Sequence, residues 1–235
     1  MQLINQKVNL EPAIRFEPSD FLEVNDGLID YNYYHENSSW SVFYENSLEK
    51  IGIRDVKFMN DNSSLISINE FNDDSLKKLI RWDLNKRFEP EFTDYIPVYL
   101  TNESDLYNWF SGGYVLKNST EDLISPACCV GFDDIESWET IQTNQNENWT
   151  MLWIGHPWVY YKLAADRVIL SEYTESNEPS IEKSEEWLSI DKIDLIEAIQ
   201  VAKNNIMDFI NKVRIIIEDI SKEPESNIKV FYEAE

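Results

Sequence analysis

One long apolar periodicity near the C-terminus constrains the fold more than any other feature of the chain. Apolar residues alternate there at spacings of four and three, at Leu195, Ile199, Ala202, Ile206, Phe209, Val213, Ile216 and Ile220. That spacing puts all of them on one face of an α-helix. The neighbouring Ile196, Ile210 and Ile217 widen this face. The pattern therefore predicts one long amphipathic helix over about 190–221.

Residues in and beside the same stretch indicate where this helix begins and ends and how it packs. Ser189 or Asp191 has the side chain of an N-cap, and Pro224 ends the region. Because the apolar face must be covered, we predict that the helix packs on a sheet of its own chain. The alternative is a homodimer in which two such helices pair through the eight apolar residues listed above, which we call the seam. The sequence therefore leaves open whether the protein is a monomer or a homodimer.

Short apolar runs separated by polar turns precede the helix and predict a mainly antiparallel sheet. The clearest are three runs at 149–154, 158–163 and 167–171, which read as a meander. Further strands are predicted at 40–44, 53–59, 65–68, 95–100 and 228–232, the second and third being joined by a hairpin-like loop at 60–64. Short helices are predicted at 72–88, 105–110 and 135–141. The fold class is α+β, with a mainly antiparallel sheet, several short helices and one long C-terminal helix packed on it. We expect a single acidic domain over 1–235, with a possible linker at 174–188.

The charge of the chain is strongly negative and unevenly distributed. The net charge is -24, and between Arg87 and Lys162 twelve acidic residues accompany a single base, Lys117. Five tryptophans in the same stretch indicate a folded region with a negative surface. Solubility alone would explain such a charge; the functional interpretation is attraction of a basic protein. With 20 bases against 44 acids, direct nucleic-acid binding is not expected.

Export, membrane and metal functions find little support in the sequence. The N-terminal residues lack the apolar core of a signal peptide, and no apolar run approaches the length of a membrane span, so we expect a cytoplasmic protein without membrane contact. Its 2 histidines, His35 and His156, have no ligand spacing, and no phosphate-binding motif is present among only 6 glycines. We therefore expect no metal, no cofactor and no enzymatic activity.

Two adjacent cysteines need a separate interpretation. Cys128 and Cys129, with His156 and Asp133 elsewhere, supply the residue types of a thiol nucleophile site. Their flanking residues are those of a buried strand, and free cysteine packs as a small hydrophobe. We predict that both side chains belong to the core.

A Trp-rich segment around residues 153–161 offers the best candidate interface. Its aromatic side chains fit a core position or, alternatively, exposed anchors of a protein–protein contact. Carboxylates nearby in the sequence could surround it. The candidate partner-binding residues are Asp133, Asp134, Glu136, Trp138, Glu139, His156, Trp158, Asp166, Glu172 and Glu175.

The strand region at 149–163, followed by 167–175, is similar in style to the terminal strands of immunity proteins of bacterial toxin systems. The resemblance implies a cytoplasmic, non-catalytic antidote that binds a cognate and often basic toxin domain and covers its active site. Carboxylates of the antidote would then pair with the Lys and Arg side chains of the toxin. The alternatives are a hydrolase-type enzyme, a nucleic-acid-mimicking inhibitor and a structural dimer.

Overall fold

The computed structural model describes residues 2–21, 40–60, 63–87, 98–100, 103–145, 147–175, 186–222 and 228–230. They form an α+β structure with mostly antiparallel sheets, short helices and a long C-terminal helix packed on strands, which confirms the predicted class. The chain divides into two compact units, Met1–Ala13 with Ser111–Ile206, and Ile14–Phe110 with Met207–Glu235. The single domain expected over 1–235 stays a prediction. Within the described residues, no helix is both long and apolar enough to cross a membrane.

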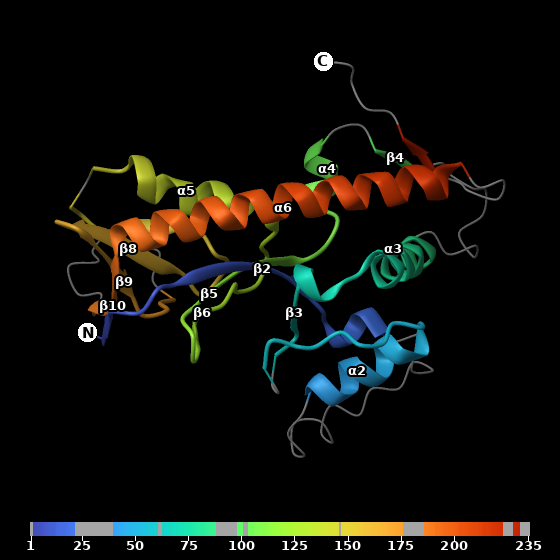
Figure 1. The fold of residues 1–235 in the computed structure, drawn as a ribbon, viewed down its shortest axis with the longest axis horizontal. Helices are drawn as coiled ribbons and strands as arrows, with labels where there is room; N and C mark the ends of the chain where they lie inside the picture. The colour runs from blue at the N-terminus through green and yellow to red at the C-terminus, as the bar shows by residue number, and fades with distance from the viewer. Residues whose placement is uncertain are drawn as a thin grey trace. The chain divides into compact units, whose positions relative to one another are not determined.

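The first unit contains a five-stranded sheet with the strand order β1-β10-β9-β8-β7 (Figure 1). Its strands are β1 (Gln2–Ile4), β10 (Glu186–Asp191), β9 (Arg167–Ser171), β8 (Val159–Ala164) and β7 (Thr150–Leu152). All neighbours pair antiparallel except β1 and β10, which are parallel. The Arg167 guanidinium stabilises this junction by donating to the backbone carbonyls of Ile4 and Ser189.

The predicted meander is confirmed as β7, β8 and β9, because β7 pairs antiparallel with β8 and β8 pairs antiparallel with β9. The strand β10 was not predicted. It occupies the end of the expected linker at 174–188, so the linker prediction is wrong for residues 186–188. Residues 176–185 of that linker lie outside the described part of the chain.

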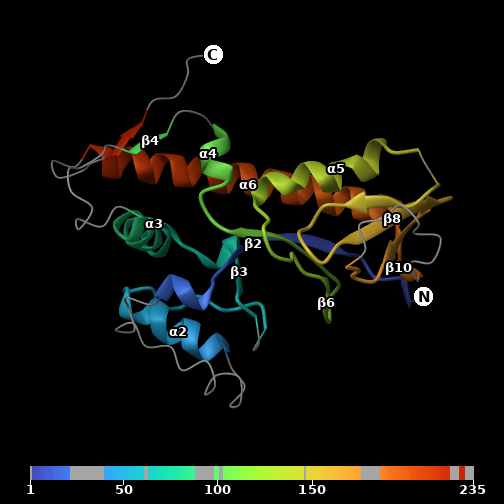
Figure 2. The same cartoon turned by 180° about the vertical axis from the view of Figure 1, so that it is seen from behind.

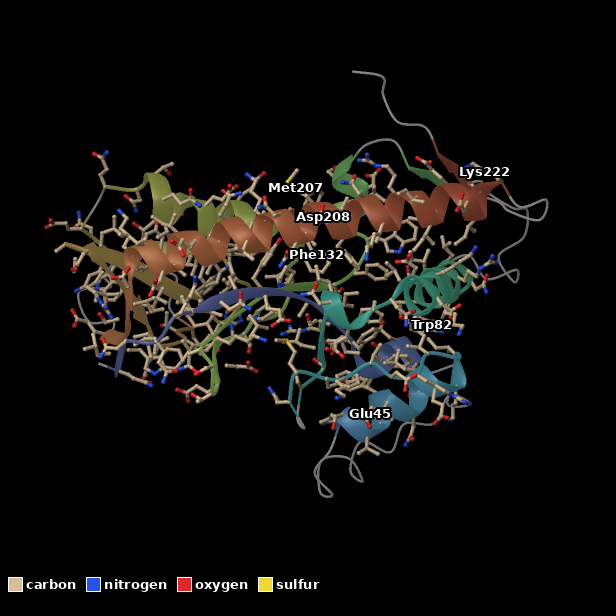
Figure 3. All side chains as sticks on the ribbon, in the orientation of Figure 1. Glu45, Trp82, Phe132, Met207, Asp208 and Lys222 are labelled. Carbon is tan, nitrogen blue, oxygen red and sulfur yellow. The ribbon has the colours of Figure 1, made fainter. Side chains whose placement is uncertain are left out.

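A second sheet has the strand order β3-β2-β5-β6. Its strands are β3 (Leu65–Ser67), β2 (Asn9–Arg15), β5 (Gly112–Lys117) and β6 (Asp122–Ile124), and β3 confirms the strand predicted there. In the first unit β5 and β6 pair antiparallel with Leu116 opposite Ile124. Neither was predicted, because β5 begins with two glycines that resemble a helix end. The hydroxyl of Tyr114 in β5 donates to the Phe132 carbonyl at 2.6 Å, and Phe132, which is labelled in Figure 3, is fully buried.

The long helix α6 (Lys192–Ser221) matches the helix predicted at 190–221. Asp191 caps it, since its Oδ1 accepts hydrogen bonds from the backbone N–H of Ile193 at 2.9 Å and of Asp194 at 3.2 Å. Every seam residue is buried apart from Ile216, which is partly exposed. In the first unit the helix runs beside α5 (Ile135–Thr143) and along the strands (Figures 1 and 2). The chain therefore covers its own seam, and pairing of two copies through this face is not needed.

The second unit contains a helix where a strand was predicted. Residues 40–44 begin α2 (Trp40–Lys50), so the strand prediction is wrong. The buried positions of α2 recur at helical spacing, at Ser41, Phe43, Tyr44, Ser47 and Leu48. A five-residue apolar run is too short to distinguish this spacing from a strand. Tertiary contacts of this helix decide the outcome: the rings of Tyr44 and Phe21 lie 6.0 Å apart, and Phe21 stacks on Trp82 at 5.0 Å (Figure 3).

The remaining predictions for this unit have mixed outcomes. The helix α3 (Asp73–Arg87) is confirmed and is capped by Asn72, whose Oδ1 accepts from the Ser75 N–H at 2.9 Å. The strand expected at 53–59 is wrong, because the only pairing described there is a single bridge between Phe58 and Ile66. Shorter elements follow the predictions approximately, as β4 (Val98–Leu100), α4 (Glu103–Tyr107) and β11 (Ile228–Val230). The strand β11 pairs in parallel with β4 in a separate two-stranded sheet.

Candidate protein-binding surface

Three segments of the first unit, 125–137, 153–161 and 171–175, are joined by backbone hydrogen bonds. The Ala127 N–H donates to the Ile154 carbonyl at 2.7 Å, and the Trp153 N–H donates to Ser137 Oγ at 2.7 Å. Trp158 and Thr174 exchange two backbone hydrogen bonds of 2.9 and 2.8 Å. Together the segments contain five carboxylates and neither lysine nor arginine. These three segments therefore produce a negative electrostatic potential at their surface.

Aromatic side chains lie within the same segments. Trp153 is 43% exposed and Tyr173 is 38% exposed, while Trp158 is partly buried. Tyr173 is held in place because its hydroxyl accepts from the Ser125 N–H at 2.8 Å and donates to the Ser125 carbonyl at 2.9 Å. We call this region the acidic aromatic surface, made of Asp133, Glu136, Trp153, His156, Trp158, Glu172, Tyr173 and Glu175.

His156 links the aromatic and acidic parts of this surface. Its Nε2 lies 2.6 Å from Glu175 Oε2, and its ring stands edge-on to Trp158 with the centroids 4.6 Å apart. The peptide bond between His156 and Pro157 is cis. These contacts orient the imidazole toward the Glu175 carboxylate, which belongs to the next segment.

Asp134 occupies a different environment from its exposed neighbours. It is partly buried at the start of α5, and its Oδ2 accepts a hydrogen bond from the Gly131 N–H at 3.1 Å. The pKa of this carboxyl is raised from 3.8 to about 6, chiefly by burial; the Gly131 hydrogen bond lowers it, and the nearby Asp133 charge contributes a smaller increase. The acid is therefore protonated more readily in the folded chain than in the unfolded chain.

This raised pKa predicts that Asp134→Asn stabilises the protein at high pH. A protonated Asp134 favours the folded state, and that stability is present below the unfolded pKa and is lost as pH rises through about 6. Asparagine keeps an acceptor for Gly131 without the buried charge. Because solvent screens a partly exposed group, we expect a gain of about 1 kcal/mol at pH 8 and none at pH 4. Urea unfolding of both proteins at the two pH values measures this, with Asp166→Asn, at an exposed position away from Asp134, as the matched control. An equal difference at both pH values would contradict the prediction.

Not every predicted partner-binding residue lies on this surface. Trp138 is fully buried in the core, so its side chain is not available to a partner. Glu139 lies farther along α5 and pairs with Lys203 of α6 at 2.6 Å. Asp166 lies in the turn between β8 and β9, at the other end of β8 from Trp158, and its carbonyl accepts from the Lys192 N–H. The structure thus places these three residues apart from the surface, since sequence proximity does not specify which end of a strand or which face of a helix a residue occupies; their role in partner binding stays a prediction.

The cysteine prediction is wrong. Cys128 and Cys129 are both exposed free thiols, and the only pairing described there is a single bridge between Cys128 and His156. The Cys128 thiol donates to the backbone carbonyl of His156 at 3.3 Å, whereas the His156 imidazole turns to Glu175. The contacts therefore differ from those of a thiol nucleophile with a histidine base. Apolar flanking residues such as Phe132 are buried, but the pair itself is not.

Ligand-binding alternatives are weaker in the described residues. No group of three or more His, Cys, Asp or Glu side chains is placed to hold a metal ion there. A cavity of about 250 Å³ beside α2 is lined partly by Glu45 and Arg54 (Figure 3 labels Glu45), and Arg54 pairs with Glu49 at 3.2 Å. It includes neither Cys128 nor His156. It therefore does not bring carboxylates together with a nucleophile or a base.

No family model, no curated protein and no solved structure matches this chain. A functional proposal for this chain therefore rests on the chemistry of the acidic aromatic surface.

Proposed function

We propose that this chain is a non-catalytic protein-binding module, and specifically an immunity protein that binds a basic toxin domain and neutralises it. The observation that carries the proposal is the clustering of five carboxylates, without lysine or arginine, in three segments that hydrogen bonds tie together around exposed aromatic rings. Such a surface combines charge attraction with apolar anchors.

The physical argument begins with the charges. A basic partner would be steered toward a negative face and would associate up to about 10–10³-fold faster at low salt than an uncharged one. Carboxylates at the rim then select against acidic partners. A toxin that acts on nucleic acid carries lysine and arginine side chains for phosphate, and those side chains are what this surface would pair with.

The aromatic side chains supply the second part of the argument. Tryptophan and tyrosine are the residues most often found at binding hot spots. Trp153 and Tyr173 are both held by hydrogen bonds of their backbone or hydroxyl groups to neighbouring segments. A partner would therefore meet a Tyr173 ring that is already fixed and a Trp153 backbone that is anchored, which lowers the entropy lost on binding.

A charge-reversal experiment tests the proposal. One variant carries Asp133→Lys, Glu136→Lys, Glu172→Lys and Glu175→Lys. The matched control carries Glu121→Lys, Asp122→Lys, Glu147→Lys and Asp166→Lys, with the same change in net charge outside the three segments. All eight acids are exposed. Each tagged protein is incubated with lysate of the source organism, eluted with salt and analysed by mass spectrometry.

We expect the wild type and the control to retain the same basic protein and the surface variant to lose it. The retained protein, expressed alone, should arrest growth, and co-expression with the wild-type chain should restore growth. Equal retention by the surface variant would show that the binding face is wrong. Retention without any growth arrest would leave a binding module and refute the antidote role.

A further inference from the structure

The two adjacent thiols on the acidic aromatic side of the first unit carry a separate inference. Cys128 and Cys129 are the only cysteines of the chain, and both are exposed. We infer that they form a dithiol site that chelates one thiophilic arsenic(III) centre through both sulfur atoms. This inference is independent of the proposed toxin binding, because it depends only on the thiols and their surroundings.

The backbone holds the first thiol in place. The Cys128 N–H and Sγ both donate to the carbonyl oxygen of His156, at 3.4 and 3.3 Å, and the preceding Ala127 N–H donates to the Ile154 carbonyl at 2.7 Å. Gly155 packs so closely that a Cβ there would lie 2.2 Å from the Cys128 carbonyl oxygen. The loop that carries the pair is therefore fixed against a neighbouring segment.

The second thiol lies within reach of the first. Cys129 has a backbone φ of 62°, in the left-handed region that non-glycine residues seldom adopt. Its thiol pKa is raised, chiefly by a hydrogen bond with the Cys128 side chain and then by repulsion from the Cys128 charge, with a smaller effect of desolvation. The two residues are adjacent, so their Cα atoms lie about 3.8 Å apart, and both thiols are exposed; the two sulfur atoms can therefore contact a single bridging atom.

Chelation suits this pair better than a direct disulfide. Disulfide-bonded cysteines usually have Cα atoms about 4.4–6.8 Å apart, whereas adjacent residues are about 3.8 Å apart. One arsenic atom inserted between the sulfurs lengthens the ring and relieves that constraint. The reaction needs no oxidant: an arsine oxide forms two As–S bonds, and its oxygen leaves as water with the two thiol protons.

Phenylarsine oxide is the probe that tests the inference. The folded wild-type protein is titrated with it, and intact-mass spectrometry counts the phenylarsenic groups bound. Cys128→Ser and Cys129→Ser, each with one thiol left, are the matched controls, and circular dichroism checks that they fold. A parallel reaction in denaturant compares reactivity in the folded and unfolded chains.

We expect one phenylarsenic group per folded wild-type chain, bound with loss of one water. Because two linked bonds hold it, the adduct should resist displacement by a monothiol about 10²–10⁴-fold better than adducts of either serine variant, and a small dithiol should remove it. Reaction only after unfolding would show that the folded site does not bind. Equal sensitivity of the wild type and the variants to monothiol would show that the sulfurs do not act together. Either result would overturn the inference.

Discussion

Replacing Trp138 by alanine is expected to lower the free energy of unfolding by about 3–5 kcal/mol, because it removes the largest fully buried side chain of the first unit. Trp138 shares the buried face of α5 with Ile135 and Ile141. The indole nitrogen has no hydrogen-bond partner among the described residues, so the loss comes from packing and not from a broken hydrogen bond. Urea unfolding followed by circular dichroism measures the change.

The matched control is Trp153→Ala, which removes the same side chain from an exposed position. We expect it to cost no more than about 1 kcal/mol, since surface substitutions usually have small effects. The pair of variants separates the structural tryptophan from the one on the acidic aromatic surface. If both cost the same, the burial assigned to Trp138 would be wrong.

Gly155→Ala is expected to have an effect of similar size for a different reason. Gly155 has a φ of 92°, and a Cβ there would lie 2.2 Å from the Cys128 carbonyl oxygen and 2.9 Å from the Ala127 carbonyl carbon. Both are backbone atoms and cannot rotate away. Strain of about 1–3 kcal/mol and overpacking of about 1–3 kcal/mol add to an expected loss of roughly 2–6 kcal/mol. Urea unfolding measures the loss.

Gly52→Ala is the control that isolates the steric part. Gly52 also has a positive φ, of 84°, but the nearest atom to a Cβ there is a flexible Lys78 carbon at 3.8 Å. It should therefore show only the backbone strain of about 1–3 kcal/mol. A Gly155 variant no less stable than the Gly52 variant would show that segments 125–137 and 153–161 do not pack as closely as described.

Trp138 and Trp153 show that the sequence did not distinguish a buried tryptophan from an exposed one. The sequence treats Trp138 and Trp153 alike, as aromatic residues of an acidic region. One lies in the core and one on the surface because α5 turns its apolar side inward while Trp153 follows the end of β7. Likewise, the apolar neighbours of Cys128 suggested burial, but the turn against Gly155 brings both thiols to the surface.

What the sequence determined by itself is the set of elements with long or regular periodicity: α6 with its Asp191 cap, α3 with its Asn72 cap, and the meander of β7 to β9. Those signals are local, because the spacing of apolar residues and the cap lie within one segment. Only the tertiary structure decided α2, β10 and the acidic aromatic surface. A short apolar run suits a helix or a strand equally well until aromatic contacts select one, and a surface built from three segments depends on hydrogen bonds between residues far apart in the chain.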